Sequence, residues 1–229
     1  MAIITISREY GSGGDEVADR VCELLGYTYF DKQQINRAAE EAGISPERVI
    51  DFPEGTYRAK TFFDRLFGQS ISIGQMMTWM ENPAYFPDPS QFEMTDDDAI
   101  ALIRQAILLA YQVGNMVIVG RGGQNLLKKY PHVLHIRIEA PLELRIQNVL
   151  RQSPQLKGTE ERKRQEARDL IQKRDQSSAE YIRNYYHADW ADAELYHALL
   201  NMGLMSVEQA AQTIVTMLQI METAPETHA

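Results

Sequence analysis

The stretch Ile3-Ile4-Thr5-Ile6-Ser7-Arg8-Glu9-Tyr10-Gly11-Ser12-Gly13-Gly14-Asp15-Glu16 decides the fold of this 229-residue chain. Its apolar, β-branched beginning predicts a buried strand, its glycines predict a turn, and the apolar periodicity that follows predicts an amphipathic helix. In α/β proteins this order brings loop N–H groups and the positive end of the helix dipole together, where a phosphate can bind. The stretch therefore predicts an anion site.

The composition is that of an ordinary soluble globular protein, with 44% hydrophobic and 24% charged residues. No apolar run approaches the roughly 20 residues of a membrane span. The N-terminal residues lack the basic and apolar regions of a signal peptide. The one cysteine, Cys22, lies on the apolar side of the first predicted helix. We therefore expect a cytoplasmic protein without a membrane association and with a buried, reduced thiol.

The net charge of −9 argues against a general nucleic-acid-binding protein, and its distribution is uneven. Ten basic and six acidic residues lie between Arg145 and Arg183, which gives this segment a net charge of +4 and the rest of the chain −13. A basic segment on an acidic body suits a small polyanionic ligand. A solvated, charged helix explains the same pattern, and the two interpretations remain open.

Strands alternate with helices along most of the chain. Strands are predicted at residues 2–7, 27–30, 116–119, 133–138 and 193–200. Gly26 is predicted to end the first helix and Ser206 to cap the last one, and Pro141 begins a long, charged helical region. This alternation predicts an α/β fold with a parallel sheet that helices cover on both faces.

The chain is expected to form one domain over residues 1–221, followed by a disordered tail at 222–229. Within it, residues 43–98 are predicted to be a helical insertion and residues 142–185 a lid. The insertion carries an aromatic and methionine-rich stripe from Phe62 to Met80. That stripe is interpreted as the core of a subdomain, with a ligand-stacking surface or a homodimer interface as alternatives.

Three sequence features follow predicted strands and should share the carboxyl edge of the sheet, where ligands of such folds bind. They are the glycine-rich turn, Asp31 after the second strand, and Gly120-Arg121 after the third. Asp31 suits a ligand role and a helix cap equally well. Arg121, between glycines at a strand end, is the strongest single candidate for a site residue.

At this point the chain resembles the cytidylate kinase-like proteins of the P-loop nucleoside monophosphate kinase superfamily. The resemblance lies in the opening stretch and covers most of the chain outside residues 43–95. Further parts of it are Tyr29-Phe30-Asp31-Lys32, Val117-Ile118-Val119-Gly120-Arg121-Gly122, Ile138-Glu139-Ala140-Pro141 with Arg145, and Asp175, Tyr181, Asp189-Trp190 and Tyr196. It implies a three-layer P-loop kinase fold with a five-stranded parallel sheet, a helical monophosphate-binding insertion and a helical lid.

The resemblance also implies phosphoryl transfer from ATP, with Mg2+, to a nucleoside monophosphate such as CMP or dCMP or to a related small acceptor. Such chemistry depends on positioning and charge neutralisation. The implied site comprises backbone groups of Gly11, Ser12, Gly13 and Gly14 around the donor phosphates, with Asp31 contacting the acceptor or a metal-bound water.

Arginines supply the positive charges that the resemblance implies. Arg121 would hold the acceptor phosphate, since a guanidinium makes two parallel contacts with phosphate oxygens. Arg145, Arg168 and Arg174 are the candidate lid arginines. Arg8 would provide the positive charge that a phosphate-loop lysine gives elsewhere; alternatively it pairs with a nearby acid such as Glu9 or Asp31.

The phosphate loop departs from the pattern G-x-x-x-x-G-K-[ST]. Gly14 occupies the lysine position and Glu16 the metal-binding Ser/Thr position. In one account Glu16 binds Mg2+, which bridges to the phosphates. In the other, the loop is a relic and the acids Asp15 and Glu16 only stabilise the helix N-terminus. The lid also departs, because Gln176-Ser177-Ser178 stands where an arginine is expected after Asp175.

The sequence therefore predicts a cytoplasmic small-molecule kinase whose partners are nucleotide substrates. Two alternatives remain: a nucleotide-sensing pseudokinase without turnover, and an interaction protein that dimerises through Phe62–Met80 and binds no nucleotide.

Overall fold

A computed structural model describes residues 2–31 and 96–223 of the chain. It divides into two compact units, one made of Met1–Tyr29 with Asn115–Ala229, the other of Phe30–Gly114. The predicted helical insertion, with its stripe from Phe62 to Met80, lies outside the described residues except for its last positions, 96–98. Residues 224–229 of the predicted tail also lie outside them.

Five strands form one parallel sheet in the order β2-β3-β1-β4-β5. The strands are β1 (Ile3–Arg8), β2 (Thr28–Phe30), β3 (Met116–Val119), β4 (Val133–Glu139) and β5 (Ala198–Asn201). β1 is central, since Ile4 lies beside Val117 on one side and Leu134 on the other. The predicted five-stranded parallel sheet is confirmed.

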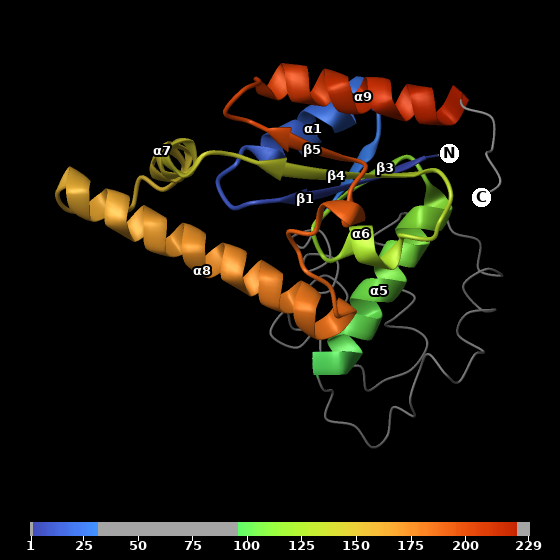
Figure 1. Cartoon of the computed structure of the whole chain (residues 1–229), viewed down its shortest axis with the longest axis horizontal. Helices are drawn as coiled ribbons and strands as arrows, with labels where there is room; N and C mark the ends of the chain where they lie inside the picture. The colour runs from blue at the N-terminus through green and yellow to red at the C-terminus, as the bar shows by residue number, and fades with distance from the viewer. Residues whose placement is uncertain (1, 32–95, 224–229) are drawn as a thin grey trace. The chain divides into compact units, whose positions relative to one another are not determined.

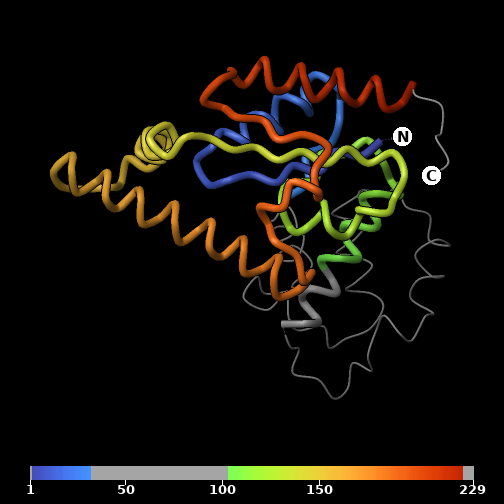
Figure 2. Tube along the Cα trace, viewed as in Figure 1, coloured from blue at the N-terminus to red at the C-terminus, as the bar shows by residue number. Residues whose placement is uncertain are grey.

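Helices of the first unit cover both faces of this sheet, as Figure 1 shows. α1 (Gly14–Leu25) and α9 (Val207–Thr223) lie on one face, and the short α6 (Gly123–Leu126) packs on the other. α7 (Leu142–Gln152) and α8 (Glu160–Tyr186) form an arm that extends from the end of β4 (Figure 2). In the second unit, α5 spans Asp96–Val113. No described helix is both long enough and apolar enough to span a bilayer.

The two faces of β1 differ in chemistry because successive side chains of a strand point to opposite sides. Ile4 and Ile6 belong to the apolar core between the sheet, α1 and α9. Thr5 and Ser7 point to the other face, where both are buried. Thr5 lies against α6, since a Cβ on Gly123 would be 3.3 Å from its methyl carbon. Polar side chains are therefore buried on the α6 face.

Local signals in the sequence placed the end of α1 and the start of α9 correctly. Gly26 ends α1 with φ = +66°, as predicted for a glycine cap. Ser206 caps α9: the N–H of Gln209 donates to the Ser206 hydroxyl at 3.2 Å, and the N–H of Ser206 donates to the Gln209 side chain at 2.9 Å. α9 runs to Thr223, two residues into the predicted tail.

The predicted fifth strand at residues 193–200 is wrong in its first half. Ala193–Leu195 form a short 3-10 helix, and β5 begins only at Ala198. The cause is the preceding residue, Asp192, whose carboxylate accepts the N–H of Glu194 at 2.9 Å and turns the chain.

Candidate active site

The loop after β1 has the backbone of an anion site. Gly11 and Gly13 adopt φ values of +78° and +87°, and α1 starts at the next residue, Gly14. The first N–H groups of a helix have no partner within it, so those of α1 point toward the loop. Ser12 is buried, and its hydroxyl makes no hydrogen bond within the described part of the chain. A buried, unpaired hydroxyl costs about 1–3 kcal/mol, and a bound oxyanion would satisfy it.

Arg8 crosses from this loop to the end of β3 through space that two glycines leave open. A Cβ on Gly14 would lie 2.5 Å from the Cβ of Arg8 and 2.8 Å from its Cγ. A Cβ on Gly120 would lie 2.7 Å from Nη1 of Arg8. Its Nε donates to Oδ1 of Asp15 at 2.9 Å, so the acid that pairs with it is a third one beside the two considered from the sequence. The guanidinium thus lies between the two loops.

The loop after β3 has an unusual backbone. Gly120, Arg121 and Gly122 are all left-handed, with φ values of +74°, +56° and +72°. For a residue with a side chain this conformation is uncommon and costs of order 1–3 kcal/mol. Such strain persists only where the surroundings impose it, which marks Arg121 as a candidate functional residue.

Two tyrosines of α8 contact this strained loop. The hydroxyls of Tyr181 and Tyr186 donate to the carbonyl oxygen of Arg121 over 3.5 Å and 3.4 Å. The ring of Tyr186 packs on Gly122 so closely that a Cβ there would lie 2.3 Å from a ring carbon. The orientation of the Arg121 peptide is therefore set against α8.

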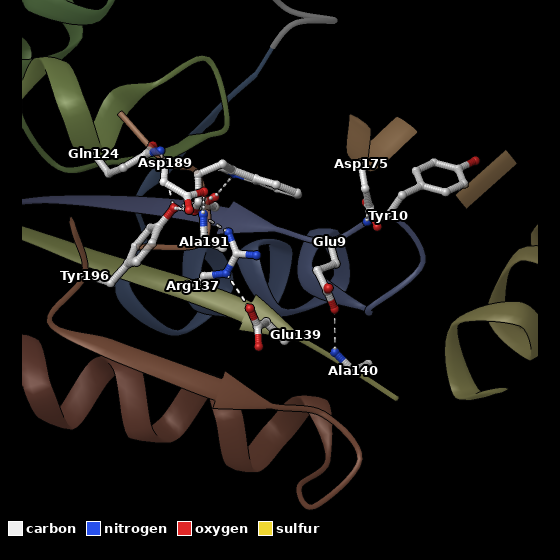
Figure 3. Close-up of polar contacts among 12 residues, drawn as sticks. Glu9, Tyr10, Gln124, Arg137, Glu139, Ala140, Asp175, Asp189, Ala191 and Tyr196 are labelled. Atoms are coloured by element: carbon white, nitrogen blue, oxygen red, sulfur yellow. Dashed lines mark hydrogen bonds and ion pairs between the residues drawn. The ribbon is translucent and has the colours of Figure 1, made fainter. Parts of the chain in front are cut away.

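Arg145, predicted to be a lid arginine, is buried beneath the first loop. Its Nε donates to the carbonyl oxygen of Tyr10 at 2.9 Å, its Nη1 lies 3.2 Å from Oε1 of Glu9, and its Nη2 pairs with Asp175 of α8. Asp175 in turn accepts the N–H of Tyr10 at 2.9 Å. Figure 3 shows Asp175 and Tyr10 side by side, with Glu9 next to them. Both backbone groups of Tyr10 are therefore held by ionised side chains.

Glu9 completes this cluster. Its Oε2 accepts the N–H of Ala140 at 3.1 Å (Figure 3). Burial raises the pKa of its carboxyl; the neighbouring carboxylates of Glu139 and Asp175 add to the rise, and the Ala140 N–H and Arg145 oppose it.

A second polar cluster lies on the α6 face of β4, and sequence reasoning missed it. Arg137 is 3% exposed; it donates to Glu139 at 2.5 Å and to the carbonyl oxygen of Trp190 at 2.7 Å, and its guanidinium stacks 4.4 Å from the centre of the Trp190 ring. The indole N–H of Trp190 donates to Ser7 at 2.7 Å. An arginine between two isoleucines of a buried strand was the available signal. Because Nε and Nη1 are bound here and the guanidinium stacks on Trp190, we interpret Arg137 as structural.

The other predicted site residues, Arg168, Arg174 and Asp31, lie outside the two loops. Arg168 and Arg174 are exposed on α8; Arg168 lies 3.7 Å from Glu143, and the guanidinium of Arg174 lies 5.7 Å from the centre of the Tyr10 ring. Asp31 directly follows β2 and belongs to the second unit. The structure thus brings Arg8 to the glycine loop and Arg174 to its edge.

Glu16 is the candidate metal ligand. Its Oε1 accepts the side-chain N–H of Gln152 at 2.8 Å, and Oε2 makes no hydrogen bond with the part of the chain that is described. A carboxylate oxygen at this place fits Mg2+, which prefers oxygen ligands and keeps several waters. Between residues 2 and 31 and between 96 and 223, no group of three or more His, Cys, Asp or Glu side chains forms a metal cage.

The chain is similar to known proteins over most of its length. The model of the cytidylate kinase-like family matches residues 3–204. No curated protein sequence gave a match. Among solved structures, an uncharacterized protein from Eubacterium ventriosum is 17% identical with a TM-score of 0.58, covering 96% of this chain and 99% of its own. Shikimate kinase from Bacteroides thetaiotaomicron is 13% identical with a TM-score of 0.49, covering 95% and 98%.

Proposed function

Because this chain belongs to the cytidylate kinase-like family, we propose that it is a cytoplasmic kinase that transfers a phosphoryl group from ATP to a nucleoside monophosphate. CMP and dCMP are the first acceptors to test, and a related small phosphate-bearing molecule is the next. Phosphoryl transfer needs the donor held, the acceptor aligned and the charge of the transferring group neutralised. Each requirement has a candidate residue in the first unit of the chain.

The path of Arg8 is the observation that carries this proposal. A phosphate-loop lysine would grow from position 14, but the space beside Gly14 is filled by the Cβ and Cγ of Arg8. The cation therefore comes from the strand instead of the helix and ends beside Gly120, at the entrance of the Arg121 loop. In this position a guanidinium neutralises charge between donor and acceptor, the place where a transferring phosphoryl group needs it.

The other roles follow from the two loops. The N–H groups at the start of α1 and the Ser12 hydroxyl would bind the donor phosphates, with Gly11 and Gly13 giving the backbone its turn. Arg121 would hold the acceptor phosphate. Arg168 and Arg174, exposed on α8, are the arginines that would reach the transferring group, whereas the buried Arg145 would act by fixing the loop at Tyr10.

Magnesium would be held by Glu16 together with the donor phosphates and water. The ion would neutralise phosphate charge in the reaction. For the protein itself, Gln152 orients one oxygen of the Glu16 carboxylate at 2.8 Å and leaves the other for a ligand. If Glu16→Gln leaves the Mg2+ dependence of nucleotide binding unchanged, the direct role of this carboxylate is wrong.

A second candidate function is nucleotide sensing without turnover. It is favoured by the ion pair between Arg8 and Asp15, because an acid beside the anion site competes with a phosphate for the same cation. The third alternative from the sequence, a dimeric interaction protein using Phe62–Met80, depends on residues outside those described.

The test is a Mg2+-dependent assay with ATP and each of CMP, dCMP and UMP, alongside calorimetric binding of the same nucleotides. The kinase proposal predicts turnover, and Arg121→Ala should raise the acceptor KM about 10-fold or more, since a hydrogen bond to a charged group contributes roughly 1.5–3 kcal/mol. Tight binding without turnover of any acceptor would favour the sensor. If the protein neither binds these nucleotides nor turns them over, the kinase proposal and the sensor proposal are both contradicted.

A further inference from the structure

One helix, α8, contacts both loops of the candidate active site. Near its middle, Asp175 accepts the N–H of Tyr10 in the loop after β1. About two and three turns later, respectively, Tyr181 and Tyr186 contact the loop after β3 at Arg121 and Gly122. Asp175 and Tyr186 are eleven residues apart, which is about 16 Å along a helix. The spacing of the contacts along α8 is therefore also a spacing between the two loops.

The contact with the first loop is charged and largely shielded from water. Asp175 binds the Tyr10 N–H through one oxygen and pairs with Arg145 through the other. Arg145 is 6% exposed and holds the Tyr10 carbonyl at 2.9 Å. Charge-assisted hydrogen bonds of this kind are about twice as strong as neutral ones. The loop's first residues thus follow any displacement of α8.

The contact with the second loop depends on shape. The Tyr186 ring takes the space that any side chain at position 122 would need, and the two hydroxyls meet the Arg121 carbonyl, which is turned by its left-handed backbone. Relaxation of Arg121 to an ordinary φ would rotate this carbonyl away from the tyrosines. The tyrosines therefore favour the strained form of the loop.

α8 is itself fixed to the arm, which makes it a suitable spacer. Its Ala167 and Ile171 pack with Ile146 and Val149 of α7 in an apolar cluster, and Tyr10 packs against the same cluster. Arg164 of α8 also pairs with Glu143 of α7.

We propose that Asp175, Tyr181 and Tyr186 are positioning residues, through which α8 sets the donor loop and the Arg121 loop at a fixed separation. They act on the backbones of Tyr10 and Arg121 and touch no reacting atom. The catalytic part of this inference rests on the proposed function, whereas the fixing of the two loops stands on the contacts alone.

The first experiment follows backbone hydrogen exchange in the whole protein, at peptides covering residues 9–14 and 120–124. Asp175→Ala should speed exchange in the first peptide at least about tenfold. Asp175→Asn, which keeps an acceptor for the Tyr10 N–H, should restore part of the protection. Tyr186→Phe and Tyr181→Phe should speed exchange in the second peptide. The matched controls Asp169→Asn, exposed on the same helix, and Tyr27→Phe, directly after the C-terminal cap Gly26 of α1, should change neither.

The second experiment measures kcat and KM for the same variants with ATP and the accepted monophosphate. Misplaced loops predict a fall in kcat of about tenfold while each KM changes less than about threefold. Independent sites this far apart should give multiplicative effects, whereas one rigid spacer predicts that Asp175→Asn combined with Tyr186→Phe departs from the product of the single effects by more than about threefold.

Unchanged exchange in both peptides, or equal changes in the two controls, would overturn the inference. If the wild-type protein transfers no phosphoryl group, the proposed function fails, and the exchange data still decide whether α8 fixes the loops. If Asp175→Ala does not fold, Asp175→Asn and the two tyrosine variants carry the test.

Discussion

The loops after β1 and after β3 both follow buried strands and both bend at left-handed glycines, yet they position their arginines by different means. Beside the first loop the position of the Arg8 side chain is fixed, because Gly14 and Gly120 leave room for it and Asp15 accepts a hydrogen bond from its Nε. In the second loop the backbone of Arg121 is held by Tyr181 and Tyr186.

The difference separates two uses of glycine. Gly14 has no left-handed φ and is required only because Arg8 occupies the place of its side chain. Gly122 is required twice, by its φ of +72° and by the ring of Tyr186. Gly14 therefore leaves room for Arg8, a catalytic candidate, and Gly122 leaves room for Tyr186, which supports the backbone of the loop.

Removal of the Arg8 guanidinium should have the largest effect on activity. Arg8→Ala is expected to lower kcat about 10²–10³-fold, the range found when a preorganised charge stabiliser is lost. Arg8→Lys should retain part of the activity, because a lysine can follow the same path with a single charge and no fork. Steady-state kinetics at saturating ATP provide the measurement. Arg20→Ala, which removes an exposed arginine bound to Glu23 and Glu208, is the control, and an equal loss there would contradict the role of Arg8.

A substitution in the second loop should act on stability. Gly122→Ala places a Cβ 2.3 Å from the Tyr186 ring at a left-handed position, so a loss of about 1–3 kcal/mol is expected. Gly26→Ala is the matched comparison, since its φ is +66° but its Cβ would meet no atom within 4 Å. Its cost should be near 1 kcal/mol. Urea unfolding of both variants gives the difference, and equal losses would show that the tyrosine contact adds nothing.

A smaller effect should appear in the pH dependence of stability. Burial raises the pKa of Glu9 above 4.5, so at pH values just above 4.5 the folded state binds more protons than the unfolded state. One component of the wild-type protein's free energy of unfolding should therefore decrease as the pH rises from 4.5 through the raised pKa. Glu9→Gln should remove this component, whereas Glu180→Gln on the exposed surface of α8 should keep it. Identical pH profiles for wild type and Glu9→Gln would contradict the assignment.

How far the sequence predicted the molecule depended on the range of the interaction. Strands, the Gly26 end and the Ser206 cap were predictable because their causes lie within a few residues. Asp192 was equally local, and its turn was overlooked inside an apolar-looking segment. The order of the strands and the burial of Arg145 under Tyr10 depend on contacts between distant residues, which no spacing encodes.

In the candidate site, too, features with local causes were predictable and contacts between distant residues were not. The glycine loop and Arg121 could be proposed from the sequence because each directly follows a strand, and strand ends meet at one edge. Asp175 and Tyr181 were noted only for their spacing and Tyr186 was not noted, since their partners Tyr10 and Arg121 lie sixty or more residues earlier. Asp15, the acid that pairs with Arg8, was missed as well, because the course of the Arg8 side chain past Gly14 depends on the three-dimensional shape of the loop.

The most direct test of the central claim, that Arg8 replaces the lysine of a phosphate loop, exchanges the two positions. Gly14→Lys alone should be damaging, because its Cβ would collide with Arg8, and Arg8→Gly alone should lose the cation. The double variant Arg8→Gly with Gly14→Lys removes the collision and restores a positive charge from the helix side. We predict that it recovers at least about tenfold in kcat over Arg8→Gly. A double variant no more active than Arg8→Gly, or a fully active Gly14→Lys, would contradict the claim.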